Sequence, residues 1–587
     1  MFDLQTKNSI PIQQTNTSHQ AYFKKEIDPA QQKDEKLKII ALGGLEEVGR
    51  NMTVFEYGQD IIILDMGMQF PEENMPGIDY IIPNIEYLRG KEKNIRGVIF
   101  SHGHLDHIGA APILLKKLGN PPIIGRDLTI AMVKHRQEDY EKNSAKNLKV
   151  IIIKNIYDQL KLGLFEVSFF PIEHSVIDAV GVIIKTPLTT IIHPGDWTLE
   201  KNIENKSTID YSFLSRLPKP TILMLESLGA VDVRESATTY EMEKNLTKLI
   251  TEAPGRLIIG TFSSQIKRIG WIIETADKIG KKVVLDGYGM KINVEIAKKL
   301  GYIKEYKNTL IKIEQAKNYP DNKIIVLCTG AQGEGNAVLS RIIENQHRHI
   351  KLKKSDTIVF SSSIIPGNER TIQRLKDNLY RQCDNVIHGD IMDIHVSGHG
   401  NRDDIIYMLQ TIKPTYFIPV YANHYMLKEA AKLAKKVGIK EDKIFVPDNG
   451  QIVEVDHKSV LLTNKRVPAN YVFVDGLGIS DGNNIVLRDR KMMAEDGMLV
   501  IISTIESKTG KLIGNPDIIS RGFVYMKENK ELIEQIRSKA KKILKDNDPR
   551  SRAFDTYLRD KIRNDLGQFV YTKTQKRPMI LPVLIEV

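Results

Sequence analysis

The feature that most constrains this chain is a run of metal-ligand side chains between an apolar strand and a helix. Residues 98–110 read VIFSHGHLDHIGA, which places His102, His104, Asp106 and His107 within six positions. Zinc readily accepts imidazole nitrogen and carboxylate oxygen as ligands. Two histidines at alternate positions of a loop leaving a strand point the same way, whereas the following Asp-His pair points elsewhere. The segment therefore predicts a cage that supplies two metal ions.

Three further residues at strand ends fit this cage. His174 follows FFPIE, Asp196 follows HPG, and Asp65 ends the apolar run IIIL. Each is a weak signal alone, because a lone histidine is more often a core or surface residue and an Asp near Gly often forms a turn. Beside the cage, His174 and Asp196 are predicted metal ligands. Asp65 is predicted to orient a metal-bound histidine or water.

Size and composition limit the class of protein. A chain of 587 residues with 41% hydrophobic residues predicts two to four folded domains. Two cysteines give no disulfide framework, and a formal charge of +11 with a pI near 9.1 favours a polyanionic partner. The first residues lack a basic stretch before an apolar core, and no run of about eighteen apolar residues occurs. We therefore expect a cytoplasmic protein with no membrane span.

The first part of the chain is predicted to form two sheets flanked by helices. Residues 1–35 are polar and without apolar periodicity, which indicates a flexible arm. Short β-rich runs then alternate with helical patterns such as 111–118 across a first domain, 36–238. The predicted strands are 37–42, 54–57, 61–64, 98–100, 150–153, 167–170, 181–185 and 190–193.

The remaining chain changes pattern twice. Strand and helix alternate over 239–388, which predicts an inserted α/β domain with a parallel sheet. The first domain resumes over 389–455, a polar linker spans 456–468, and a small α/β domain occupies 469–587. In the insertion we predict strands 257–260, 282–285 and 324–327 and helices 266–279, 292–300 and 337–344; in the last domain, strands 472–474, 485–487 and 498–504 and helix 530–544.

The order of these ligands along the chain resembles the metallo-β-lactamase superfamily. Further motifs narrow the resemblance to its β-CASP branch: LES at 225–227, HVSGHG at 395–400 and the strand YFIPV at 416–420. The resemblance to bacterial ribonuclease J extends from Leu37 to Val587 and includes CTGAQGE at 328–334, SSSIIPGNE at 361–369, DGLG at 475–478, VLRDR at 486–490, DIISRGF at 517–523 and KRPMILP at 576–582. It implies an αββα sandwich with an inserted β-CASP domain and a small C-terminal α/β domain.

The resemblance also implies an activity and roles for individual residues. It implies a zinc-dependent ribonuclease with 5′-3′ exonuclease and endonuclease activity in RNA processing and decay, assembled as a homodimer or homotetramer. His102, His104 and His174 would hold one zinc, Asp106 and His107 the other, and Asp196 would bridge them. Glu226 and His399 would act beside the leaving group. The substrate phosphate would be held by His395, Val396, Ser397, Gly398, His399, Ser361, Ser362 and Ser363.

The sequence departs from the family at the second zinc site. The usual PVHGE motif is replaced by PVYANHY, which puts Tyr421 at the ligand position. A neutral phenol is a poorer zinc donor than imidazole, so we expect His424 to replace it, with Tyr421 or water as the alternatives. Gly77, Asp79 and Asp475 occupy positions where relatives bind an extra hard cation such as calcium, although acidic surface residues would give the same pattern.

Two other functions compete with the ribonuclease. A catalytically weak RNA-binding subunit of a ribonuclease complex would explain the tyrosine at position 421. Hydrolysis of a small ester or lactam shares the metal cage, but leaves the inserted and C-terminal domains without a role. The complete set of the other ligands favours the ribonuclease.

Overall fold

The computed structural model describes residues 35–72, 74–201, 207–234, 238–332, 337–362, 364, 368–476, 478–481, 485–507, 509, 511–524, 528–546 and 552–587. In its described parts the chain forms two compact units. Unit 1 comprises Met1–Gly67 and Ile85–Ala469, and unit 2 comprises Met68–Asn84 and Asn470–Val587. Within the described residues, no helix is both long and apolar enough to cross a lipid bilayer.

Unit 1 contains two large mixed sheets, as the sequence predicts. One has the strand order β20-β19-β1-β2-β3-β5-β6-β7 and the other β18-β12-β11-β10-β9-β8. The first comprises β1 (Leu37–Gly43), β2 (Met52–Tyr57), β3 (Asp60–Leu64), β5 (Ile95–Ile99), β6 (Ile123–Gly125), β7 (Val150–Ile152), β19 (Gln451–Val455) and β20 (Val460–Arg466). The second comprises β8 (Gln159–Leu162), β9 (Phe165–Pro171), β10 (Val180–Lys185), β11 (Thr190–His193), β12 (Thr221–Glu226) and β18 (Tyr416–Val420).

The two sheets pack face to face around an aliphatic and aromatic core. Phe55 and Leu64 of the first sheet join Phe165 and Val182 of the second in one fully buried cluster. A second cluster seats two helices from beyond the insertion, α9 (Arg402–Ile412) and α10 (His424–Lys436), against the outer face of the second sheet. At the β7 end of the first sheet, α3 (Asp127–Tyr140) contacts β6 and β7, and α2 (Ala111–Lys117), which follows α1 (Leu105–Ile108), packs on α3. These layers give the predicted αββα sandwich.

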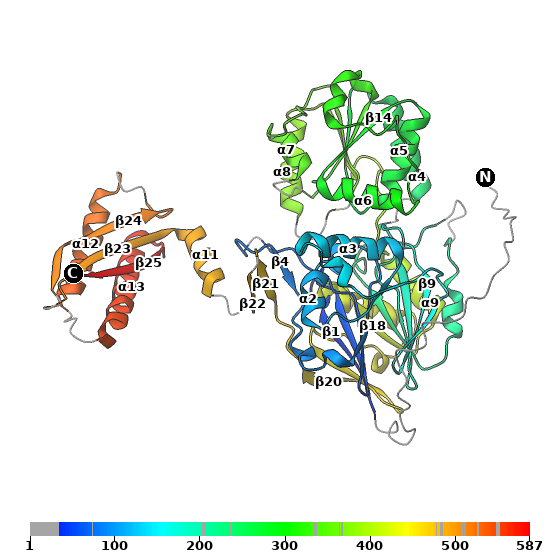
Figure 1. Ribbon diagram of the computed structural model, residues 1–587, viewed down its shortest axis with the longest axis horizontal. Coiled ribbons are helices and arrows are strands. Elements are labelled where there is room, and N and C mark those ends of the chain that lie inside the picture. Colours follow the sequence, from blue (N-terminus) through cyan, green and yellow to red (C-terminus); the bar gives the residue numbers. More distant parts are fainter. Residues whose placement is uncertain are drawn as a thin grey trace. The chain divides into compact units, whose positions relative to one another are not determined.

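The insertion is an α/β/α sandwich around a fully parallel sheet, as predicted (Figure 1). Its strand order is β14-β15-β13-β16-β17, and the central strands are buried on both faces, which explains their continuous apolar sequences. The strands are β13 (Leu257–Gly260), β14 (Lys282–Asp286), β15 (Ile324–Cys328), β16 (Thr357–Phe360) and β17 (Asn385–Ile387). One face is covered by α4 (Thr239–Glu252), α5 (Ile266–Lys278) and α6 (Tyr288–Lys299), the other by α7 (Val338–Ile343) and α8 (Glu369–Tyr380).

Unit 2 has two small sheets. In the first, β21 (Val472–Asp475) pairs with β22 (Gly478–Asp481) and with β4 (Tyr80–Ile82). The second has the order β24-β23-β25, with β23 (Met498–Ile505), β24 (Leu512–Arg521) and β25 (Met579–Glu586). Two long helices, α12 (Lys530–Lys545) and α13 (Arg552–Thr574), bury their apolar faces against this sheet, and α11 (Ile485–Asp496) precedes it.

The structure corrects the sequence prediction at three places. The predicted linker 456–468 contains β20, an edge strand that pairs with β19 and exposes most of its polar side chains. The predicted strand 485–487 is the first turn of α11, because a short apolar run has no periodicity that separates strand from helix. Residues 68–84, expected in the first domain, belong to unit 2 through the pairing of β4 with β21.

Candidate metal centre and RNA site

The predicted metal ligands meet where strands of both sheets of unit 1 end. His102 follows β5, His174 follows β9 and Asp196 follows β11. Strands β11, β12 and β18 are parallel, so their carboxyl ends share one edge of the sheet, which also places Glu226 at the site. The loop after β5 turns directly into α1, which carries Asp106 and His107. The topology thus gathers the ligands from three separate segments and adds Glu226 from a fourth.

The first ligand set consists of three imidazoles and one carboxylate. The Nδ1 atom of His104 lies 3.1 Å from Nε2 of His102 and 3.1 Å from Nε2 of His174. The Oδ2 atom of Asp196 lies 3.7 Å from Nε2 of His102 and 3.9 Å from Nε2 of His174. Four donor atoms thus converge within 4.8 Å of one another, which is the donor chemistry of a tetrahedral zinc site.

The second ligand set consists of Asp106, His107 and the other oxygen of Asp196. Nε2 of His107 lies 3.2 Å from Oδ1 of Asp196 and 3.6 Å from Oδ2 of Asp106. These donors also lie within 4.8 Å of one another. Asp196 is 3% exposed and turns one carboxylate oxygen toward each set, so a single side chain faces both groups of ligands.

Each ligand imidazole has an inner ring nitrogen, which faces the other donors, and an outer ring nitrogen, which has a separate hydrogen-bond partner. Hydrogen bonds of this kind fix the ring and its tautomer, and leave the inner nitrogen free to bind a metal. The pairs are His102 Nδ1 with Ser101 Oγ at 3.0 Å, His104 Nε2 with Ser264 Oγ at 2.9 Å, His174 Nδ1 with Gly398 O at 2.6 Å, and His107 Nδ1 with Asp65 Oδ2 at 2.8 Å.

Burial keeps the first set in the form that binds metal. It holds the pKa of His102 and of His104 well below the usual value, and lowers the pKa of His174 to about 4. These rings are therefore neutral at neutral pH and present a lone pair at the inner nitrogen. The donor types, their convergence and their protonation all fit a bound cation.

Asp65 supports the second set as the sequence predicts. Its carboxylate is fully buried and accepts hydrogen bonds from the backbone N–H and the hydroxyl of Ser101, both at 2.8 Å, besides that from His107. Its φ of +63° bends the chain, and Gly67 follows where an added Cβ would collide with the carbonyl of Asp106. The turn therefore serves to place this carboxylate under the ligand loop.

Tyr421 occupies the position where the resemblance implies a histidine ligand. The Tyr421 ring is 4% exposed, with its centroid 5.4 Å from that of His107 and 5.1 Å from that of His193. Burial raises the pKa of its phenol well above the usual value, and the oxygen makes no well-formed hydrogen bond to any described residue. A neutral phenol thus lies beside the second set, which has three protein donors.

The prediction that His424 replaces the missing ligand is wrong. His424 is the first residue of α10, and its ring nitrogens are not among the donors that converge in the second set. Its side chain is 45% exposed, and its Nδ1 lies 3.8 Å from Glu46 and 3.9 Å from Asp448. It belongs to a separate, largely exposed group of side chains.

Glu226 and His399 lie together beside the ligands. Nδ1 of His399 is 3.7 Å from Oε2 of Glu226 and 4.0 Å from Oδ2 of Asp196. Burial alone would lower the pKa of His399, but these carboxylates outweigh it and raise the pKa to about 9. Trp197 is fully buried, donates from Nε1 to the carbonyl of Glu226 at 3.2 Å, and leaves room only for a glycine at Gly400. Trp197 thereby fixes the segment of Glu226 and the segment of His399 and Gly400.

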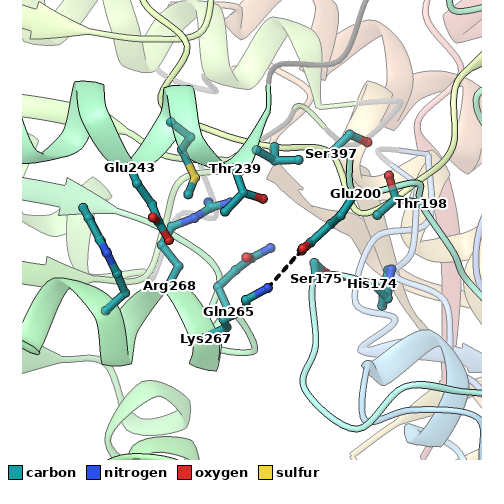
Figure 2. A pocket seen from close by; sticks show the side chains of 13 residues that line it. His174, Ser175, Thr198, Glu200, Thr239, Glu243, Gln265, Lys267, Arg268 and Ser397 are labelled. Carbon is teal, nitrogen blue, oxygen red and sulfur yellow. Dashed lines mark hydrogen bonds and ion pairs between the residues drawn. The ribbon is translucent and has the colours of Figure 1, made fainter. Parts of the chain in front are cut away.

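The predicted phosphate-binding segments border the same site. Gly398 contacts His174 through its carbonyl, and Val396 and Ser397 line a pocket with His174 (Figure 2). Ser361 is buried and donates to the carbonyl of Ile394, which ties the serine loop to the segment before His395. Ser362 follows it, whereas Ser363 lies outside the described residues.

Gly77, Asp79 and Asp475 are the residues predicted to bind an extra cation in unit 2, and the positively charged Arg490 already contacts two of them. Arg490 donates to the carbonyl of Gly77 at 2.9 Å and to the carboxylate of Asp475 at 2.5 Å. Asp79 accepts from the backbone N–H of Gly476 at 2.7 Å. A guanidinium therefore contacts two of the three predicted ligands, and no described geometry here gathers them around an ion.

Sequence reasoning missed several residues of the site. Asn51 Nδ2 lies 2.9 Å from Nε2 of His107, Ser264 of the insertion bonds His104, and Arg268 contacts His395. Nothing in the local sequence marks them, because each reaches the site from a segment without a metal or phosphate motif. Only the packing of the insertion on the first domain reveals Ser264 and Arg268.

The chain matches family models along most of its length. They are the metallo-beta-lactamase superfamily at residues 45–247, the ribonuclease J beta-CASP domain at 254–379, the Zn-dependent metallo-hydrolase RNA specificity domain at 386–447 and the ribonuclease J C-terminal domain at 485–587. Among solved structures, a protein of unknown function from Enterococcus faecalis V583 matches with a TM-score of 0.50 and 16% identity, covering 71% of this chain and 100% of that chain, which shows likeness of fold.

Curated relatives match nearly end to end. The chain is 34% identical to Ribonuclease J2 of Bacillus subtilis (strain 168), over 94% of this chain and 99% of that protein. It is also 34% identical to Ribonuclease J 1 of Streptococcus pyogenes serotype M3, over 94% and 98% respectively. Ribonuclease J 2 of Staphylococcus epidermidis is 30% identical over 94% and 99%. The chain therefore belongs to the ribonuclease J family and is a metal-dependent RNA hydrolase.

Proposed function

We propose that this ribonuclease uses two zinc ions and cleaves RNA both from the 5′ end in the 5′-3′ direction and internally. The observation that carries the proposal is the division of donors into two sets that share Asp196. A pair of divalent ions in such an arrangement polarises a phosphodiester and activates water near neutral pH. The nitrogen-rich first set favours zinc over magnesium or calcium, which prefer oxygen ligands.

The side chains around the ligands have separate tasks in this proposal. His102, His104 and His174 hold one ion, and Asp106 and His107 hold the other with Asp196. His399, kept protonated by Glu226 and Asp196, is placed to give a proton to the leaving oxygen. The segment His395 to Gly398 and the serine loop hold an RNA phosphate and so align the bond to be cleaved.

Tyr421 favours a second candidate, a catalytically weak RNA-binding subunit. The second set has three protein donors, and the nearby phenol is neutral. An ion held this way is bound more weakly than one in the first set. The two candidates differ in one outcome: the active enzyme fills both sets at micromolar zinc, whereas the weak subunit retains only the first ion and cleaves slowly.

Reconstitution of the metal-free protein tests the proposal. Purified protein is stripped with a chelator, reloaded with zinc, manganese or magnesium, and given RNA labelled at either end. We expect zinc to restore activity, with mononucleotides released from the 5′ end and internal fragments from a structured RNA. Activity restored by magnesium but not zinc would contradict the zinc assignment, and mononucleotides released only from the 3′ end would contradict the direction.

The resemblance to ribonuclease J also supports a proposal for the quaternary structure. We propose a homodimer or homotetramer, which light scattering on the full-length protein would measure directly. A monomer at micromolar concentration would contradict it.

A further inference from the structure

The first turn of α5 carries a buried cation that has no acidic partner. Arg268 is 7% exposed and donates to the carbonyl of Ser361 at 2.9 Å, to its hydroxyl at 3.1 Å and to Nδ1 of His395 at 2.7 Å. All three acceptors are neutral, and Nε of Arg268 has no partner among the described residues. Burial lowers the pKa of Arg268 to about 10, so the side chain stays charged at neutral pH. Buried charges are normally paired, which makes this one unusual.

Arg268 also determines which ring nitrogen of His395 carries the proton. Because the guanidinium donates to Nδ1 of His395, that nitrogen carries no proton and the ring is neutral with its proton on Nε2. Nε2 is buried and makes no well-formed hydrogen bond to the described part of the chain. The pair therefore presents two unused donors, Nε of Arg268 and Nε2 of His395.

Arg268 lines a pocket that also contains the ligand His174, and His395 directly precedes Val396, another residue of that lining. Gln265, which directly precedes α5, and Lys267 and Arg268 of its first turn line the pocket together with His174 and Ser397 (Figure 2). Backbone N–H groups at the start of a helix add positive potential there.

Two carboxylates share this lining with Arg268. Glu200 pairs with Lys267 at 3.0 Å, as the dashed line in Figure 2 shows, and Glu243 projects from α4. Neither makes an ion pair with Arg268 in the described structure. The guanidinium is therefore left for an anion that enters the pocket.

We propose that Arg268 and Nε2 of His395 bind a phosphate group of the RNA, and that Arg268 positions His395 for this contact. The inference rests on the proposed function, in which His395 already belongs to the segment that holds a phosphate, and adds Arg268 to it. A phosphate oxygen would supply the missing negative charge and accept both unused hydrogen bonds. It can come from a 5′-terminal monophosphate or from an internal phosphodiester, which share this chemistry but differ in charge.

Binding measurements on the full-length, zinc-loaded protein separate these sources. The probes are two 2′-O-methyl oligonucleotides of one sequence, with a 5′-phosphate or a 5′-hydroxyl, which resist cleavage. The variants are Arg268→Met and its control Lys267→Met, which removes an equal charge from the same turn at a side chain that is 60% exposed. Hydrogen bonds to charged groups predict a loss of about tenfold or more for Arg268→Met.

The pattern of losses decides the inference. If Arg268→Met removes a preference for the 5′-phosphate that Lys267→Met retains, the residue binds the terminal phosphate. If Arg268→Met weakens both probes equally and Lys267→Met does not, it binds an internal phosphodiester. Wild-type affinity in Arg268→Met, or equal losses in both variants, would overturn the proposal.

Further readouts guard against a purely structural effect. Thermal melting and zinc content establish that each variant is folded and loaded, and Arg268→Lys should recover part of the affinity. The His395 ring should change tautomer in Arg268→Met, which nitrogen-15 chemical shifts of labelled histidine report; an unchanged tautomer would overturn the positioning role. Wild-type cleavage of RNA is measured beside these, so failure of the proposed function would be seen separately.

Discussion

Replacement of Asp65 by asparagine should weaken metal binding while leaving the fold intact. Asp65 is fully buried and holds Nδ1 of His107 at 2.8 Å, so it fixes the tautomer that turns Nε2 toward the second ligand set. Asparagine keeps the shape and tolerates the φ of +63°, but it loses the charge and offers an amide where a carboxylate oxygen accepted.

The size of the effect follows from the role of such outer partners. Their removal costs about 10- to 100-fold in metal affinity, or about 1.4–2.7 kcal/mol. The loss should fall on the second ion, because His107 belongs to that set alone. The fold loses the charge on one hydrogen-bond acceptor, which costs about 1–2 kcal/mol of unfolding free energy.

Competition with a chromophoric zinc chelator measures the two affinities separately. Asp60→Asn is the matched control, because Asp60 begins β3, the strand that Asp65 follows, is also buried, and accepts hydrogen bonds from Arg96 and from the backbone of Leu164 rather than from a ligand. We expect the control to bind both ions as the wild type does. A second-ion affinity in Asp65→Asn within about threefold of the control would refute the reasoning.

Five more substitutions, at four positions, have defined outcomes. Gly398→Ala places a Cβ 2.9 Å from Cε1 of His174, so zinc affinity of the first set and RNA binding should both fall, as zinc titration and filter binding would report. Tyr421→His should tighten the second ion by about tenfold or more, whereas Tyr421→Phe and His424→Ala should leave the zinc content unchanged; a loss of zinc in His424→Ala would contradict its placement outside the site. Arg490→Met should lower stability by about 1 kcal/mol or less, since the pair is partly exposed, and should create a calcium-dependent rise in Tm that the wild type lacks.

The sequence could predict a cluster of ligand-type side chains because most of its members are local in the chain. Four ligand-type residues fall within six positions, and strand ends mark His174 and Asp196, so the topology had only to bring three segments to one edge. The parallel sheet of the insertion was equally readable, because strands buried on both faces, such as β13, are continuously apolar.

What the sequence could not predict depends on contacts between distant segments. Arg268 resembles any charged residue of an amphipathic helix, and only tertiary packing buries it against Ser361 and His395. The strand β4 belongs to unit 2 only through pairing with residues about four hundred positions later, and edge strand β20 has the polar composition of a linker. His424 illustrates the same limit, since the local sequence does not show that it begins α10 and lies with Glu46 and Asp448.

Zinc content measured beside RNA cleavage in the wild type and in Asp196→Ala tests the central claim most directly. Asp196 is the one described side chain that faces both ligand sets, so its loss should disturb both ions at once. The account predicts about two zinc ions per chain and cleavage of 5′-phosphorylated RNA in the wild type, with less than one ion and a rate lower by several orders of magnitude in the variant. Wild-type turnover in Asp196→Ala at confirmed low zinc would contradict it.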